Sequence, residues 1–306
     1  MSLKLSVVGE DDSSEPVASL DAVPAGVGRV AHRIVHGGAR FREPVVIDAD
    51  VESELAALVE LAPLHNAPAL TALADARRAL PDVPHVAVFD TAFHATIPDF
   101  ASAYAVPRRW RDEWGIRRYG FHGLSVQWVA EQVRVPRLVV CHLGGGCSVT
   151  AVLDGRSVDT TMGFSPLEGV PMATRSGSID PEIVLHLLRA GKLQLEEVEA
   201  ALERESGLLG LSGASARVEE LERSDDPAAR LALAVFCYRV AYAVGAMTAA
   251  LGGLDAVAFT GGVGERSEHV RDEVCERLRF LGEFRIEVVE TREDVVAARA
   301  AFAVLA

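Results

Sequence analysis

Apolar positions recur along the chain in two patterns. Short runs rich in Val, Ile and Leu predict buried β-strands, at 3–8, 29–36, 85–90, 137–143, 147–153, 156–162, 254–260 and 285–290. Longer stretches with apolar residues three or four apart predict helices, at 50–61, 68–80, 122–134, 180–190, 194–205, 227–251, 265–279 and 293–304. The two patterns are interspersed, which predicts an α/β fold. Residues 10–28 are acidic and then rich in Pro, Gly and Ala, and are interpreted as a surface linker.

Composition narrows the class of protein. The 306 residues are 49% hydrophobic, enough for a sizeable core. A formal net charge of −14 argues against a general nucleic-acid or anionic-membrane binder, because neutralising phosphates requires a basic surface. The four cysteines form no CxxC pair and are expected to be reduced thiols. The apolar stretch 231–251 is long enough to span a membrane, but Arg239 interrupts it, which favours a buried helix.

Two glycine-rich turns are candidates for anion binding. CHLGGGCSV at 141–149 is a strand, three glycines and another strand, and AFTGGVGERSEHV at 258–270 is a strand, a glycine turn and a helix. Glycine lets backbone amides approach an anion closely, and the adjacent His142 favours phosphate over a plain hairpin turn. The second turn alone is weak evidence, since many α/β turns have this composition.

Other candidate residues lie beside strand ends or glycines. Asp90 ends the strand at 85–90, where α/β folds place catalytic or metal-binding carboxylates, although an Asp there also caps helices. The segments 31–38, 118–123 and 173–181 each place Arg or His next to glycine. Arg can clamp a carboxylate or phosphate with two hydrogen bonds. A single surface Arg is usually a solvated charge, so the argument rests on their number.

Together these motifs resemble the acetate kinase family. They are LAPLHN (61–66), VFDTAFH (88–94), WGIRRYGFHG (114–123), CHLGGG (141–146), SVDTTMGFSPLEGV (157–170), TRSGSIDP (174–181), SGLLGLSG (206–213) and FTGGVGE (259–265). The resemblance runs from about Val30 to Glu265 and extends more weakly to both ends. It implies the fold of the acetate and sugar kinase/Hsp70/actin superfamily, two duplicated ribonuclease H-like (actin-like) α/β domains with a cleft. The expected domains are 1–91 completed by 292–306, and 92–291.

The resemblance implies reversible phosphoryl transfer from ATP to acetate, giving acetyl phosphate and ADP, with Mg²⁺ or Mn²⁺. Arg33 and Arg175 would flank the acetate carboxylate and the phosphoryl group, His122 would stabilise the transition state, and Asp90 would orient the reacting groups or the metal together with Glu293. The implied acid pocket is Val35, Leu64, Phe121 and Pro166. The implied nucleotide contacts are Lys4, His142, Gly144, Gly145, Gly146, Gly261, Gly262, Val263 and Gly264. The resemblance also implies a cytoplasmic homodimer, with 227–251 and 95–130 as candidate contact surfaces.

The sequence departs from the family pattern in four places. The opening strand and most of the Asn-x-Gly-Ser-Ser-Ser-x-Lys loop are missing before Lys4. Gly145 replaces an amide side chain that contacts phosphate. Arg217-Val218-Glu219 replaces the Asp-x-Arg whose Arg packs on adenine. The region 280–290 is shorter than usual, and Arg292 replaces an Asn beside Glu293.

The start of the chain raises a separate expectation. Residues 148–155 (SVTAVLDG) and 2–9 (SLKLSVVG) both run from a small polar residue through an apolar strand into a turn, but only the later copy follows a strand and a glycine loop. The hypothesis is that the chain is truncated at its N-terminus by about one strand, roughly 5–10 residues.

Two alternatives stay open at this point. The changes at Gly145 and at 217–219 allow a carboxylate kinase that uses another phosphoryl donor, such as pyrophosphate. The missing first loop allows a catalytically impaired relative with a binding or regulatory role. The intact set Arg33, Asp90, His122 and Arg175 argues against the second.

Overall fold

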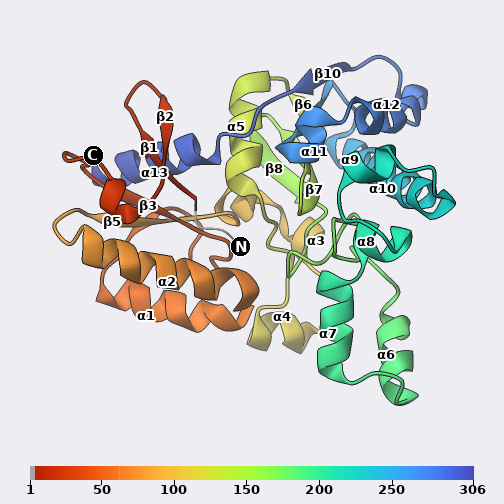
Figure 1. Ribbon diagram of the computed structural model, residues 1–306, viewed down its shortest axis with the longest axis horizontal. Helices are drawn as coiled ribbons and strands as arrows, with labels where there is room; N and C mark the ends of the chain where they lie inside the picture. The colour runs from red at the N-terminus through yellow and green to blue at the C-terminus, as the bar shows by residue number, and fades with distance from the viewer. Residues whose placement is uncertain (1–3, 62) are drawn as a thin grey trace. The chain divides into compact units, whose positions relative to one another are not determined.

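The protein has the predicted α/β fold (Figure 1). The structure is a computed structural model, and it describes residues 4–61 and 63–306, except for the side chains of residues 61–65. Its contacts divide the chain into two compact units. Unit 1 comprises the chain up to Thr96, Phe121–Trp128 and Arg292–Ala306, and unit 2 comprises Ile97–Gly120 and Val129–Thr291. The sequence predicted a first boundary near residue 91 and did not single out 121–128, which pack with unit 1.

Unit 1 is built on a small sheet with helices on both faces. Its strands are β1 (Leu5–Val8), β2 (Ser14–Val17), β3 (Val30–Ile34), β4 (Val45–Val46) and β5 (His85–Phe89). Its helices are α1 (Ala49–Ala57), α2 (Pro63–Ala79), the start of α5 (Gly123–Val133) and α13 (Glu293–Leu305), with 3₁₀ turns at Leu20–Ala22, Leu58–Leu61 and Ala92–Thr96. Strand β5 lies between β3, which is parallel to it, and β4, which is antiparallel. Among the described residues, β1 and β2 form a separate antiparallel pair.

The alternation of side chains in β5 explains the two helical layers of unit 1. Ala87 and Phe89 point to one face, where they pack with Leu55 of α1 and Leu73 of α2. Val86 and Val88 point to the other face, where they meet Leu124 of α5 and Val296 of α13. Figure 1 shows α1 and α2 on one side of these strands and α13 on the other. Because both faces are covered, every residue of β5 is buried, as the apolar run from Val86 to Phe89 indicates.

Unit 2 is built on a five-stranded sheet in the order β10-β9-β6-β7-β8. Its strands are β6 (Arg137–Leu143), β7 (Cys147–Leu153), β8 (Arg156–Thr160), β9 (Ala256–Thr260) and β10 (Arg285–Val288). Strands β6, β9 and β10 are parallel, whereas β7 and β8 follow β6 as antiparallel hairpins. Its helices are α3 (Asp99–Ser102), α4 (Arg108–Trp114), α6 (Pro181–Arg189), α7 (Leu195–Arg204), α8 (Gly207–Ser212), α9 (Val218–Glu222), α10 (Pro227–Leu251), α11 (Gly261–Arg266) and α12 (Glu268–Glu276), with a 3₁₀ turn at Arg279–Leu281.

Helix α10 is the apolar stretch that was long enough to span a membrane. It is the one helix in the described part of the chain whose length and composition would allow a crossing. However, 56% of its most apolar stretch is buried inside the protein, as is typical of a core helix. It packs on β6, β7 and β8 and contacts α8, α9 and α12. This packing agrees with the prediction of a buried helix.

Three predictions of local structure were wrong. Residues 10–28 are not only a linker, because Ser14–Val17 form β2 and pair with Leu5–Val8. The helix predicted at 265–279 is two helices, since Ser267 ends α11 and its hydroxyl caps α12 by accepting a hydrogen bond from Val270 N–H. The helix predicted at 68–80 begins earlier, at Pro63, and accommodates Pro68 within it.

Candidate active site

Two predicted site residues of unit 1, Asp90 and Glu293, contact the guanidinium of Arg33. Arg33 lies on β3, one residue before the strand ends, and Asp90 follows the end of the parallel strand β5. Arg33 Nε donates to Asp90 Oδ1 at 2.8 Å, and Nη2 donates to Oδ2 at 2.7 Å. Arg33 Nη1 donates to Glu293, the first residue of α13. Three chain segments therefore place one cation between two carboxylates.

The charged groups of this cluster shift the pKa values of one another. Burial by itself would lower the pKa of Arg33, but Asp90 and Glu293 outweigh it and raise that pKa, so the guanidinium stays charged. Burial raises the pKa of Glu293 against the opposing effect of Arg33. Three of the five guanidinium N–H groups bind these carboxylates, which leaves one on Nη1 and one on Nη2 with no partner in the described part of the chain. Arg33 can therefore bind an anionic oxygen without releasing either partner.

Phe121 and His122 are held beside Asp90 by backbone contacts. Gly123 N–H donates to the carbonyl of Asp90 at 2.9 Å, and a Cβ at Gly123 would lie 2.2 Å from that oxygen, so only glycine allows the approach. His122 has a φ of 59°, in the left-handed region that non-glycine residues seldom adopt. Such strain is typical of functional positions that the surrounding structure holds in place. Phe121 is buried, and its ring packs against the His36 ring in a T-shaped arrangement with centroids 5.4 Å apart.

Sequence reasoning missed two buried residues that support this region. Asn66 belongs to the LAPLHN motif, and its amide accepts from His36 N–H at 3.1 Å and donates to His36 O at 3.1 Å. It therefore fixes the backbone just after Val35, which is half-buried. His94 is 2% exposed, and its Nε2 donates to the carbonyl of Phe121 at 2.8 Å. Both residues lie inside family motifs, Asn66 in LAPLHN and His94 in VFDTAFH, and this position was the one sequence feature that could have indicated them. Leu64, of the predicted acid pocket, has a side chain outside the described part of the structure.

Two buried histidines of unit 1 predict acid sensitivity. Burial lowers the pKa of His32 and of His94 to about 4, from an ordinary value of 6.5. Between these values the unfolded chain binds more protons than the folded one, so stability is complete above pH 6.5 and is lost as the pH falls toward 4. We expect the protonation of each histidine to lower the free energy of unfolding by up to ~3 kcal/mol as the pH falls from 6.5 toward 4. The measurement is urea unfolding from pH 7.5 to 4.5.

A matched pair of variants isolates this effect. His94→Gln keeps a donor for the Phe121 carbonyl but cannot titrate, so its stability should fall less steeply over this pH range. His186 is exposed on α6, and His186→Gln should leave the slope as in the parent protein. Equal slopes for all three proteins would contradict the assignment to His94.

The predicted nucleotide residues of unit 2 meet where β6 and β9 end. His142 of β6 pairs with Thr260 of β9 and with Ser148 of β7. The next residues of the two parallel strands are the two glycine turns, and a Cβ on Gly144 would lie 3.9 Å from Gly262 N. Gly261 has a φ of +78°, and a Cβ there would lie 2.7 Å from Leu143 O. The two turns predicted to bind phosphate are therefore neighbours in space.

Not every amide of these turns faces outward. Gly144 N–H donates to Gly146 O at 3.0 Å, and Gly261 N–H donates to Glu265 at 3.0 Å. Both amides are engaged by the protein itself, and the direct phosphate contacts of the whole set stay predictions. Thr260, which sequence reasoning missed, is buried, and its hydroxyl has no hydrogen-bond partner among the described residues.

Arg175 lies on a loop that contacts the glycine turn. Ala173 N–H donates to Gly145 O at 3.4 Å, and Arg175 Nη1 donates to Pro166 O at 3.3 Å. Burial lowers the pKa of Arg175, and Glu203 opposes that effect. Unit 2 thus brings together Arg175, Pro166 and the turn after His142. In the predicted adenine segment, Arg217 directly precedes α9 and is paired with Glu220 of that helix at 3.2 Å.

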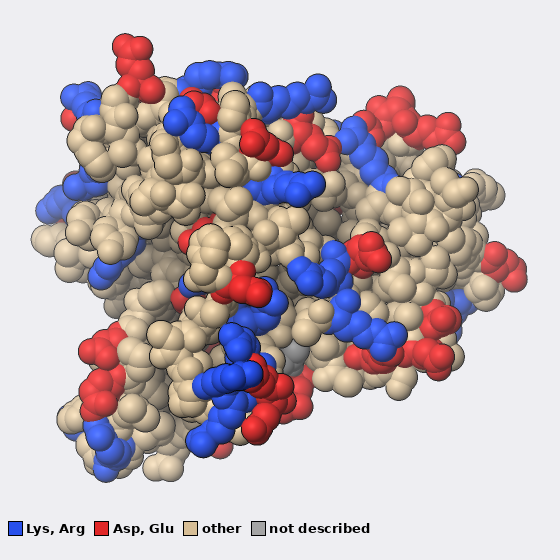
Figure 2. All heavy atoms as spheres, turned by 180° about the vertical axis from the view of Figure 1, so that it is seen from behind, with Lys and Arg blue, Asp and Glu red and all other residues tan. Residues whose placement is uncertain are grey.

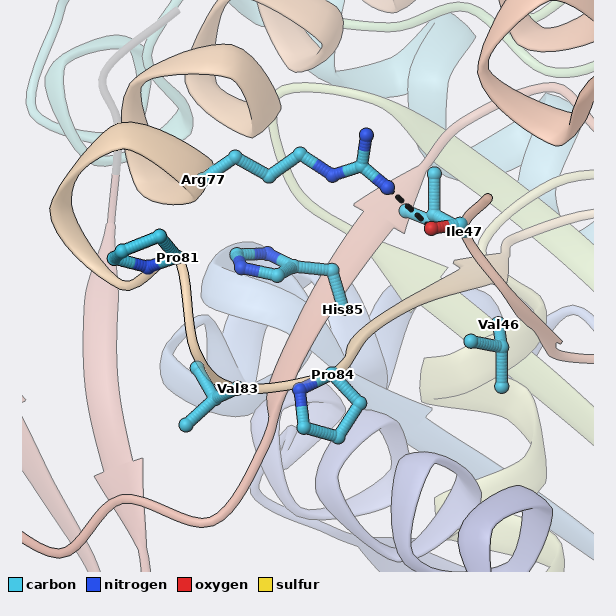
Figure 3. A pocket seen from close by; sticks show the side chains of 7 residues that line it. All are labelled: Val46, Ile47, Arg77, Pro81, Val83, Pro84 and His85. Atoms are coloured by element: carbon cyan, nitrogen blue, oxygen red, sulfur yellow. Dashed lines mark hydrogen bonds between the residues drawn. The ribbon is translucent and has the colours of Figure 1, made fainter. Parts of the chain in front are cut away.

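A separate hollow lies at the other end of β5. It encloses about 350 Å³ and is lined by Val46, Ile47, Arg77, Pro81, Val83, Pro84 and His85 (Figure 3). Figure 3 shows Arg77 reaching past His85 to the carbonyl of Ile47. His85 begins β5, whereas Asp90 follows its last residue, so this hollow does not belong to the Arg33 cluster.

Comparison with known proteins decides the family. The sequence profile of the acetokinase family matches residues 18–301. This chain belongs to the acetokinase family. An acetate kinase from Nostoc punctiforme is 47% identical over 83% of this chain and 65% of its own length, and one from Deinococcus radiodurans is 49% identical over 84% and 67%. The chain therefore spans about two thirds of the length of these curated relatives.

Solved structures of acetokinases share the fold. A propionate kinase from Francisella tularensis superposes with a TM-score of 0.87 at 36% identity, covering 90% of this chain and 79% of that one. The acetate kinase of Porphyromonas gingivalis gives a TM-score of 0.85 at 30% identity, covering 99% and 90%. Membership of the acetokinase family and the acetate kinase fold, both implied by the motifs, are confirmed.

Proposed function

We propose that this acetokinase is an acetate kinase that transfers the γ-phosphoryl group of ATP to acetate and also catalyses the reverse reaction. The observation that carries the proposal is the Arg33 cluster, in which one guanidinium is held by Asp90 and Glu293 and two of its N–H groups have no partner among the described residues. The family and its named relatives support the same activity. The chain spans only part of those relatives, so the activity is a proposal for this chain.

The charges of the described residues suit phosphoryl transfer. The reaction requires positioning and neutralisation of charge more than proton transfer. Acetate is already ionised at neutral pH and needs no base. Arg33 and Arg175 would each offer a permanent cation to the carboxylate and the phosphoryl oxygens. His122, held in its strained backbone conformation, would donate a hydrogen bond to the transferred group.

The carboxylates of unit 1 fit a divalent cation that is shared with substrate. The described residues contain no group of three or more His, Cys, Asp or Glu side chains that could enclose a metal. Mg²⁺ commonly takes one or two carboxylates and completes its shell with water and phosphate oxygens. Asp90 and Glu293, joined through Arg33, provide such a pair. The cation would neutralise phosphate charge when bound.

The apolar groups predict a preference for small acids. Phe121 and Pro166 are buried and Val35 is half-buried, as expected for residues that contact a methyl group. One methylene changes the free energy of binding by only ~1–3 kcal/mol. The relative from Francisella tularensis is a propionate kinase. Propionate is therefore a second substrate to test.

The decisive experiment is acyl phosphate formation by the purified chain. Acetate or propionate is mixed with Mg²⁺ and ATP, and the product is trapped with hydroxylamine. A parallel reaction replaces ATP with pyrophosphate. We expect product with ATP and acetate. If product forms with pyrophosphate and not with ATP, pyrophosphate takes the place of ATP as the proposed donor. If neither donor gives product, the proposed activity is contradicted.

Because Gly145 lacks a side-chain donor, we expect ATP to bind weakly and a substitution that restores an amide to strengthen its binding. Gly145 is exposed, its φ is not in the left-handed region, and a Cβ there meets no atom within 4 Å. We expect Gly145→Asn to lower the KM for ATP by about tenfold, because a hydrogen bond to a charged group is worth ~1.5–3 kcal/mol. Gly145→Ala makes the same backbone change without a donor and should leave the KM unchanged. An equal effect of both variants would exclude the amide as the cause.

We also propose that the active protein is a homodimer. Leu231, Tyr238 and Tyr242 are each more than half exposed on α10 and are spaced by seven and four residues, so they form one stripe along the helix. Figure 2 shows basic and acidic side chains interspersed over the face in view. Light scattering should give twice the 32.6 kDa mass of one chain, and a monomer mass at assay concentration would contradict the proposal.

A further inference from the structure

Unit 2 contains a polar network that the proposed mechanism does not use. At its centre is Arg118, whose side chain is only 17% exposed. Its Nη1 donates to three successive carbonyls and its Nη2 donates to Glu168 Oε1 at 3.0 Å. The three carbonyls, with their distances, are those of Thr160 (2.8 Å), Thr161 (3.1 Å) and Met162 (3.2 Å). One guanidinium therefore holds the end of β8 and the chain that follows it.

Tyr104 completes the network from a separate segment. Its hydroxyl donates to Glu168 Oε2 and accepts from Phe164 N–H at 2.8 Å. The ring lies near the Arg118 guanidinium, whose carbon is 5.6 Å from the ring centroid. The carbonyl of Gly163 is held nearby, since it accepts from Tyr119 N–H at 3.0 Å. A Cβ at Gly163 would lie 2.0 Å from the Tyr104 hydroxyl and 1.6 Å from Glu168, so the loop is pressed against the network.

The 163–169 loop held in this way reaches two predicted site residues. Pro166 belongs to the loop, and its carbonyl accepts from Arg175 Nη1 at 3.3 Å. At the end of the loop, Ser178 N–H donates to Gly169 O at 2.8 Å, and Ser178 Oγ accepts from Gly169 N–H at 3.1 Å. The loop is therefore joined to the network on one side and to the chain around Arg175 on the other.

A partly buried ion pair is weak evidence for stability, because the desolvation of both charges offsets their attraction. Arg118 nevertheless donates hydrogen bonds to four acceptors, and its Nε forms a longer ion pair with Asp159 Oδ1 at 3.8 Å. Such saturation fixes the geometry of the groups it contacts. Here those groups are the carbonyl of Thr160 at the end of β8 and those of Thr161 and Met162 just after it, so the network defines how the chain leaves β8 and enters the 163–169 loop.

We propose that Tyr104, Arg118 and Glu168 are positioning residues that hold the 163–169 loop so that Pro166 and Arg175 fit a small monocarboxylate. None of the three is proposed to touch the substrate. The inference rests on the proposed function, since Pro166 and Arg175 are assigned to the acid through it. Loosening the network should impair recognition of the acid and leave recognition of the nucleotide unchanged.

The test uses Tyr104→Phe and Glu168→Gln, with Tyr119→Phe as the matched control. The Tyr119 hydroxyl donates to the carbonyl of Gly115 at 2.8 Å, at the end of α4, whereas Tyr119 reaches Gly163 O through its backbone N–H, which the substitution to Phe keeps. We expect both network variants to raise the KM for acetate by about tenfold and to change the acetate-to-propionate ratio of kcat/KM, since small misplacements of binding groups are costly. The KM for ATP should stay within about twofold.

The double variant and a measurement without turnover complete the test. Tyr104→Phe/Glu168→Gln should raise the KM for acetate by less than the product of the two single rises, because both residues belong to one network. Hydrogen exchange should speed up in 161–169 for the network variants and not for Tyr119→Phe. Equal rises in the KM of both substrates, or unchanged kinetics with a lower melting temperature, would overturn the positioning role. If the parent protein makes no acyl phosphate, the proposed function fails, whereas unchanged exchange in 161–169 refutes the network alone.

Discussion

Arg33→Ala should lower kcat/KM for acyl phosphate formation by at least about a thousandfold. A cation that neutralises the transferred phosphoryl group is worth ~10³–10⁵ in comparable enzymes. The substitution also leaves Asp90, whose side chain is 2% exposed, without its bidentate partner. The loss should appear mainly in kcat, measured with hydroxylamine trapping at saturating acetate and ATP.

Three further variants separate charge, geometry and stability. Arg33→Lys keeps the positive charge but cannot bind Asp90 through two parallel hydrogen bonds, so it should recover only a small part of the activity. Arg33→Ala/Asp90→Asn removes the unpaired carboxylate and should recover stability against urea without recovering activity. Arg40, seven residues along, is paired with Glu54 at the surface, and Arg40→Ala should act like the parent. Activity of Arg33→Ala within tenfold of the parent would remove Arg33 from the mechanism.

Gly207→Ala should destabilise the protein by ~3–5 kcal/mol, in the range of the largest single-residue effects. Gly207 begins α8 with a φ of +61°, and a Cβ there would lie 2.1 Å from Met172 O and 2.7 Å from Arg175 O. Both obstacles are backbone atoms, which cannot turn aside as a side chain can. The 172–175 loop that this Cβ would displace carries Arg175. The variant should therefore lose activity even at urea concentrations where it is still folded. Urea unfolding and kcat/KM measured on the same samples check both effects.

Gly213→Ala is the matched control at the other end of the same helix. Gly213 has a φ of +65°, but a Cβ there meets no atom within 4 Å. It should cost only the ~1–2 kcal/mol of a left-handed conformation. The difference between the two variants measures the close approach of α8 to the 172–175 loop. Equal destabilisation would show that backbone conformation alone explains both glycines.

Much of the fold follows from local pattern. The strands predicted at 85–90, 137–143 and 254–260 agree with β5, β6 and β9 to within two residues at each end. These strands lie inside sheets, where burial on both faces requires an unbroken apolar run. Short or exposed elements carry no such signal. Strand β2 reads SEPV and β4 has two residues, so both were missed.

For the candidate site, too, some residues could be predicted from the sequence and others could not. Motifs pointed to Arg33, Asp90, His122, Arg175 and the glycine turns, because each chemical role restricts the residue type. Parallel pairing of β3 with β5 then places Arg33 and Asp90 at the same edge of a sheet. The supporting residues are not predictable in this way. Asn66 and His94 act through backbone carbonyls, and sequence spacing does not show which carbonyl a side chain will reach.

The sequence by itself determined the class of fold, the family and the types of residue that carry the proposed chemistry, since those depend on local periodicity and on motifs of a few residues. Only the tertiary structure decided that Glu293 joins Arg33 from 260 residues away, and that Arg118, Tyr104 and Glu168 converge on one loop. Long-range contacts of this kind depend on how helices and sheets pack, and the free energy of that packing is shared among many apolar residues. No short segment of the sequence therefore records them.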